Sequence, residues 1–125
     1  MTEEQVIHTV RTYIEKQFPK ECKNCGYRYG SLKEYLKTTV HIGAPHSYDA
    51  EGENWQPAKP LGTYSFADCK CGNTLVIGSS RMNVATMCRL LWWAKKEKAK
   101  RGITVNELLS DLREKIDNQV LSEDK

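Results

Sequence analysis

The stretches Cys22-Lys-Asn-Cys25-Gly26 and Cys69-Lys-Cys71-Gly72 decide the fold of this chain. Each holds two cysteines separated by one or two residues, and a glycine follows the second cysteine. Two such turns brought together in space form a tetrahedral thiolate site, which is the usual geometry of structural zinc. Glycine adopts a positive φ at little cost, as a sharp turn after the second cysteine requires. We therefore predict a metal site whose ligands are Cys22, Cys25, Cys69 and Cys71.

The residues around the first pair read Cys22-Lys-Asn-Cys25-Gly26-Tyr27-Arg28-Tyr29. This segment resembles a knuckle of the zinc-ribbon and rubredoxin families. The second pair, which continues as Asn73-Thr74, is similar but has one spacer residue instead of two and no proline in the turn. The resemblance covers these short segments and the strands beside them. It implies a metal-binding β-ribbon with the four cysteines as ligands.

Cysteine ligands favour one Zn²⁺ ion at this site, although a sulfur tetrahedron also suits iron. Cysteines in such pairs can also form disulfides or stay unpaired as thiols. Residues 1–20 lack the apolar segment of a signal peptide, so we expect a cytoplasmic chain with reduced cysteines. Four thiolates close the coordination shell, which favours a structural ion over a catalytic one. His41 and His46 have the right chemistry to replace a cysteine, but their spacing is not that of a convincing ligand pair.

The pattern of the 125 residues predicts a single α+β domain over residues 1–125. Apolar positions indicate an N-terminal helix over residues 1–18, where Thr2 and Gln5 form a capping box. We expect a metal ribbon with a small antiparallel sheet over residues 22–78, including a strand at 37–42 and a long loop at 43–62. Residues 63–66 and 74–77 have the composition of strands on either side of the second knuckle.

A helical hairpin is predicted over residues 83–120. The first helix covers residues 83–100, with Ser80 or Asn83 as its cap. Gly102 fits the left-handed position at which helices end. Thr104 and Glu107 then form a capping box that begins the second helix.

Basic side chains are concentrated in one part of the chain. Residues 1–80 carry nine basic and nine acidic side chains, whereas residues 81–101 carry seven basic and one acidic. The second helix of the hairpin is acidic, so a helix-turn-helix that inserts this helix into a DNA groove is disfavoured. A basic helix end can still contact phosphates without reading bases. We therefore expect nucleic-acid binding through Arg28, Lys95, Lys96, Lys98, Lys100 and Arg101.

Two tryptophans are candidates for contact with a protein partner or for a homodimer. Trp93 belongs to an adjacent pair on the helix of residues 83–100, and Trp55 lies in the long loop. Buried tryptophans would be the simpler interpretation of both. An exposed tryptophan, by contrast, is a common anchor of protein interfaces.

The chain shows no Ser/His/Asp set, phosphate-binding glycine loop or His-Glu metal helix, so no catalytic residue is proposed and an enzyme is disfavoured. No apolar stretch reaches the length of a membrane span, so we expect no membrane partner. The sequence favours a non-enzymatic zinc-binding module that either associates with nucleic acid or has a regulatory role. The alternatives are a protein-interaction or assembly module and a rubredoxin-like electron-transfer protein.

Overall fold

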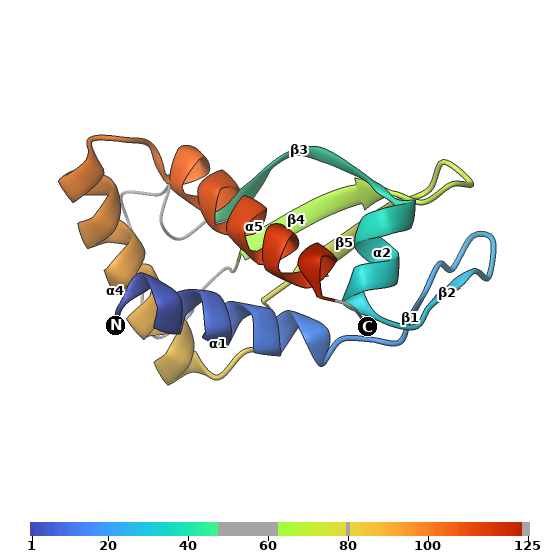
Figure 1. Cartoon of the computed structure of the whole chain (residues 1–125), viewed down its shortest axis with the longest axis horizontal. Helices are drawn as coiled ribbons and strands as arrows, with labels where there is room; N and C mark the ends of the chain where they lie inside the picture. Colours follow the sequence, from blue (N-terminus) through green and yellow to red (C-terminus); the bar gives the residue numbers. More distant parts are fainter. Residues whose placement is uncertain (48–62, 80, 124–125) are drawn as a thin grey trace.

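The computed structural model of the chain describes residues 1–47, 63–79 and 81–123. These residues form an α+β fold with an N-terminal helix, two small antiparallel sheets and a C-terminal pair of helices, which confirms the predicted class (Figure 1). The elements follow in the order α1 (Glu3–Glu15), β1 (Lys20–Glu21), β2 (Arg28–Tyr29), α2 (Leu32–Thr38), β3 (Val40–Ser47), β4 (Thr63–Asp68), β5 (Thr74–Gly78), α4 (Val84–Arg101) and α5 (Val105–Ser122).

Helix α1 begins at the predicted capping box. The Thr2 hydroxyl accepts a hydrogen bond from the Gln5 amide, and the Gln5 side chain accepts one from the Thr2 amide. Two orphan amides of the first turn are satisfied in this way. The helix ends at Glu15, earlier than the predicted boundary at residue 18.

The segment between the knuckles corrects the predicted strand at residues 37–42. Ser31 caps α2, since its hydroxyl accepts a hydrogen bond from the Glu34 amide, and the helix continues to Thr38. Strand β3 therefore begins only at Val40. The β-branched residues Thr38–Val40 favoured a strand and obscured this boundary, because the helix cap lies seven residues before the first of them.

The predicted long loop at residues 43–62 is also shorter than expected at its start. Residues 43–47 belong to β3, which pairs antiparallel with β4, and a register shift lies between Ile42 and His46. Residues 48–62 lie outside the described residues. Strand β4 pairs with β5 on its other edge, so the sheet order is β3-β4-β5.

Helices α4 and α5 form the predicted hairpin. The Asn83 side chain accepts hydrogen bonds from the amides of Ala85 and Thr86 at the start of α4. Gly102 ends this helix with φ at 67°, in the left-handed region. The capping box of Thr104 and Glu107 then begins α5.

Helix α5 is the central element of the core. It contacts β3, α1, α2 and α4, and Figure 1 shows it lying across the three-stranded sheet. Its apolar positions recur at three- and four-residue steps, which places them on one face. The buried members of this face are Val105, Leu108, Leu112, Ile116 and Val120.

Ion pairs join α1 to the C-terminal hairpin. Glu3 accepts hydrogen bonds from Arg101 and Lys115, at 3.1 and 2.6 Å. Asp111 pairs with the same two cations at 3.1 and 3.0 Å. At the other end of α1, Arg11 donates to Glu123 at 2.6 Å. These contacts fix the direction of α1 along α5.

Among the described helices, none combines the length and the apolar character that a membrane-spanning segment requires.

Candidate functional site

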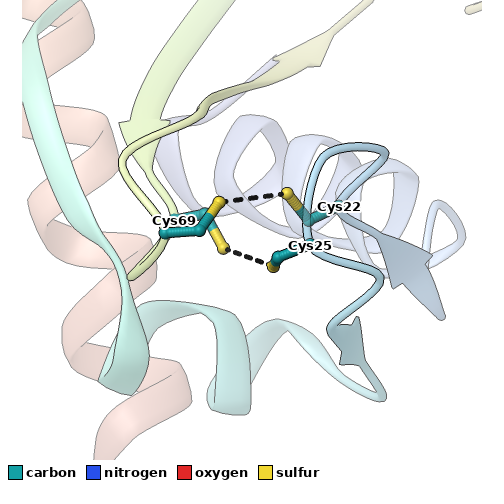
Figure 2. Close-up of side chains that lie close together, drawn as sticks. Cys22, Cys25 and Cys69 are labelled. Atoms are coloured by element: carbon teal, nitrogen blue, oxygen red, sulfur yellow. Dashed lines mark hydrogen bonds between the residues drawn. The ribbon is translucent and has the colours of Figure 1, made fainter.

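The two cysteine pairs meet at one point in space. Cys22 and Cys25 lie on the turn between β1 and β2, and Cys69 and Cys71 lie on the turn between β4 and β5. The four sulfur atoms are all within 4.8 Å of one another. Figure 2 shows Cys22 and Cys25 pointing across the gap toward the turn that carries Cys69. Two segments that are distant in the sequence therefore present their thiols to a common centre.

The spacing of the sulfurs fits a tetrahedral ion. The Sγ atoms of Cys22 and Cys71 are 3.7 Å apart, and those of Cys25 and Cys69 are also 3.7 Å apart. A regular tetrahedron with metal–sulfur bonds of about 2.3 Å has edges of about 3.8 Å. The same distances are far longer than a disulfide bond of about 2.05 Å, and all four cysteines are free thiols.

Both turns are closed by an equivalent backbone hydrogen bond, which the amide of the first cysteine donates. In the first, the Cys22 amide donates to the Tyr27 carbonyl at 2.9 Å, and in the second the Cys69 amide donates to the Asn73 carbonyl at 2.8 Å. The glycine of each turn has positive φ, 78° at Gly26 and 92° at Gly72. An L side chain there would be strained, which explains the glycine after each pair.

The missing spacer residue of the second pair changes only the size of the turn. The Gly26 amide donates to the carbonyl of Cys22, four residues earlier, at 2.8 Å. The Gly72 amide donates to the carbonyl of Cys69, three residues earlier, also at 2.8 Å. The shorter pair thus closes a tighter turn and still brings its two sulfurs to the same side.

Side-chain donors surround the sulfurs. The Tyr29 hydroxyl donates to Cys69 Sγ at 2.9 Å, and both residues are buried. Asn24 of the first turn donates to Cys71 Sγ of the second at 3.4 Å. Asn73 of the second turn donates in return to Cys22 Sγ of the first, at 3.7 Å. Donors of this kind stabilise charge on sulfur and hold the ligands in place.

Hydrogen bonding favours the thiolate form of the first cysteine in each pair. The backbone amides of Cys25 and Asn24 lower the pKa of Cys22 to about 6, against the opposing effect of burial. The backbone amide of Cys71 and the Tyr29 hydroxyl lower the pKa of Cys69. These groups are therefore prepared to ligate, because the thiolate is the metal-binding form.

Four cysteines at this centre can all be thiolates only if a cation lies between them. A hydrogen bond from the Tyr27 backbone lowers the pKa of Cys25. Desolvation and the neighbouring sulfurs have the opposite and larger combined effect, so the pKa of Cys25 is raised to about 11. Four thiolates this close repel one another unless a positive ion lies between them. Within the described part of the chain, this cluster is made of cysteines alone. The arrangement could thus form a metal site.

The predicted nucleic-acid residues lie in two separate places. Arg28 is exposed on β2, at the opposite end of the long axis from α4, which carries the lysines (Figure 1). Lys96 and Lys100 are exposed, whereas Lys95 and Lys98 are partly buried. Arg101 binds the carboxylates of Glu97, Glu3 and Asp111 at 2.7, 3.1 and 3.1 Å, and these hydrogen bonds raise its pKa.

The tryptophan pair on α4 has one exposed and one inner member. Trp92 is 54% exposed, and Lys95 Nζ lies 5.9 Å from the centre of its ring. Trp93, the predicted partner contact, is partly buried against the main core. Trp55 lies outside the described residues.

Sequence reasoning missed one residue of the exposed face of α4. Arg89 lies three residues before Trp92, and Trp92 lies four before Lys96, so these side chains share one helical face. All three are exposed. The three- and four-residue spacing that identified the apolar side of the helix also groups its exposed positions. Applied to those positions, it would have identified this arginine.

Comparison with known proteins identifies no relative: no protein-family model matches the chain, and no curated protein or solved structure matches it either.

Proposed function

We propose that Cys22, Cys25, Cys69 and Cys71 bind one zinc ion whose role is structural. The observation that carries this proposal is the common centre of the four sulfurs, all within 4.8 Å of one another. Four thiolates leave no open coordination position for a substrate or an activated water. The ion would join the β1–β2 hairpin to the β4–β5 turn, and so connect the two sheets.

The same geometry accepts iron, so the metal must be identified directly. The protein is produced in medium containing both zinc and iron, purified without a metal-affinity step, and analysed by mass spectrometry of its metals. We expect one equivalent of zinc and a colourless protein. One equivalent of iron with the absorption of a ferric thiolate site would instead support an electron-transfer role. The variant with Cys25 and Cys71 changed to Ser should lose the ion.

We further propose that the outer face of α4 binds single-stranded nucleic acid. Arg89, Trp92, Lys96 and Lys100 are exposed and lie at three- and four-residue steps on this face. Three cations supply phosphate contacts, and the exposed indole ring supplies a surface on which a base can stack. Arg28 is too distant to join this face, and Arg101 is engaged by carboxylates. The proposal therefore depends on a smaller set of residues than the sequence suggested.

Binding of a fluorescent single-stranded oligonucleotide over a salt series tests this second proposal. The triple variant Arg89→Gln, Lys96→Gln, Lys100→Gln should weaken binding and reduce the salt slope by roughly 0.7 for each phosphate that is no longer neutralised. A control variant changes the exposed Lys16, Lys37 and Arg81 to Gln and removes the same charge elsewhere. Equal weakening of binding in both variants would show that net charge, and not this face, is responsible.

A protein partner is the competing occupant of this face, because the same exposed Trp92 could anchor an interface. Absence of oligonucleotide binding, together with a mass that increases with protein concentration and returns to the monomer in Trp92→Ala, would favour self-association.

A further inference from the structure

An apolar cavity of about 170 Å³ lies between the three-stranded sheet and helices α1, α4 and α5. Side chains from each of these elements line it, among them Ile14, Ile77, Leu90, Trp93, Leu109 and Ile116. Its volume resembles that of an engineered apolar cavity of about 150 Å³, which stays dry and binds benzene. A cavity of this size in a close-packed core forfeits dispersion energy unless a molecule fills it.

Polar side chains also line this cavity. His41 of β3 and Asp117 of α5 are joined by a hydrogen bond of 3.2 Å between Nε2 and Oδ2. Arg113 precedes Asp117 by one helical turn, so its side chain projects from the same face of α5. His41, Arg113 and Asp117 are thus the titratable, charge-bearing part of the lining, whereas most of the exposed wall area is apolar.

Two polar atoms of this part of the lining lack a partner. His41 Nδ1 and Arg113 Nη1 are buried, and neither has a hydrogen bond within the described structure. Buried polar atoms without partners are rare in folded proteins, because each costs free energy and asks for an explanation. Arg113 Nη1 can only donate, so the missing group must be an acceptor. A molecule that combines an apolar part with an acceptor group would fill the cavity and also bond to this atom.

We propose that the cavity binds a small apolar carboxylate, a molecule with a ring or a short hydrocarbon chain and one carboxylate end. A carboxylate is the acceptor that a guanidinium group binds most strongly, through charge-assisted hydrogen bonds. The bond between His41 Nε2 and Asp117 fixes the orientation of the imidazole ring beside this site. The guanidinium of Arg113 supplies the positive charge to which the carboxylate binds.

A water molecule is a weaker explanation of the two unpaired atoms. One water could bond to these polar atoms, but the rest of the cavity would remain apolar and empty, and such a space does not hold water. A site with mostly apolar walls and a few converging polar groups is typical of small-molecule binding. The proposal is independent of the metal centre, since none of the four cysteines lines the cavity.

Titration with hexanoate and with hexanol, followed by the methyl resonances of the whole metal-loaded protein, tests this proposal. The two probes share a chain of the same length and differ in the carboxylate. We expect both probes to shift the methyl signals of Leu109 and Ile116, and hexanoate to bind about tenfold more tightly or better. Arg113→Gln should remove this advantage and leave hexanol binding within about twofold. Arg81→Gln serves as the control, because Arg81 is exposed and does not line the cavity.

Three outcomes would overturn the proposal. The first is that neither probe shifts the cavity methyl signals, and the second is that both probes bind equally well to the unaltered protein. The third is that Arg113→Gln weakens the binding of both probes to the same extent, which would show that Arg113 only shapes the cavity wall. If Arg113→Gln fails to fold, Arg113→Lys keeps the charge, and the comparison of the two probes on the unaltered chain still decides the question. In the variant Leu90→Trp the larger side chain should fill the cavity and exclude hexanoate.

Discussion

The Tyr29 hydroxyl lies 2.9 Å from the sulfur of Cys69 inside the protein, where neither residue is more than 2% exposed. Burial, followed by the hydrogen bond to the sulfur, raises the pKa of Tyr29. The hydroxyl therefore keeps its proton at neutral pH and acts as a donor. A tyrosine beside the first cysteine pair thus stabilises a cysteine of the second.

Removal of this hydroxyl should weaken the metal site without unfolding the chain. We expect Tyr29→Phe to lower metal affinity by about 10-fold to 100-fold, because Cys69 no longer has this donor while the ring remains packed. Competition with a coloured zinc chelator measures the change. Tyr27→Phe is the matched control, since its hydroxyl donates to Glu34 at 2.6 Å instead of to a sulfur. Equal affinities in the two variants would contradict the assigned role of Tyr29.

Metal removal should unfold at least the β1–β2 hairpin. This hairpin has two residues in each strand, too few for stability alone. Structural zinc contributes about 10–16 kcal/mol of apparent binding energy, as much as the stability of a typical domain. Amide resonances of residues 20–29 should collapse toward random-coil positions when chelator is added, and return with zinc. An unchanged spectrum in a sample shown to be free of metal would refute this.

The ion pairs of Glu3 should make stability depend on acid. Hydrogen bonds from Lys115 and then Arg101 lower the pKa of Glu3 from 4.5, so its contribution is complete above that pH and is lost as the pH falls through the lower, folded-state pKa. We expect Glu3→Gln to lower the free energy of unfolding by about 0.5–1 kcal/mol at pH 7. Urea titrations at several pH values should show this difference shrinking below pH 4.5. The exposed neighbour Glu4 provides the control variant Glu4→Gln, for which we expect little change.

Truncation of the central side chain of α5 should be costly. Leu108 is fully buried in the main core, and Leu108→Ala should lower the free energy of unfolding by about 2–5 kcal/mol. Leu121→Ala on the same helix is the control, because Leu121 is 42% exposed. Urea denaturation at constant zinc concentration measures both. Similar destabilisation at the two positions would place the core elsewhere.

Short-range signals made much of this fold predictable. The capping boxes at Thr2 and Thr104 and the glycine at 102 are local features, and the structure has each of them where the sequence placed it. Of the two candidate caps Ser80 and Asn83, the structure uses Asn83. The convergence of the two cysteine pairs was also predictable, because thiols on tight turns have few stable partners other than a shared ion. The binding of an ion at this centre, and its identity, stay predictions.

The helix Leu32–Thr38 was missed because its apolar residues fit strand and helix periods equally well. Its local start signal, Ser31 with Glu34 three residues later, was not used. Other features depend on tertiary contacts that no local pattern reveals. The pairing of Arg101 with Glu3 joins residues that lie 98 positions apart in the sequence. The His41–Asp117 bond joins a strand to a helix 76 residues later. Such pairs could not be inferred from spacing.

The position of α5 in the sequence has a consequence for biosynthesis. This helix contacts β3, α1, α2 and α4, all of which precede it. On the ribosome, both cysteine turns emerge before the element that covers the nascent hydrophobic surface. Capture of the proposed ion by these turns can therefore come first, and would hold the earlier segments in native proximity until α5 closes over them.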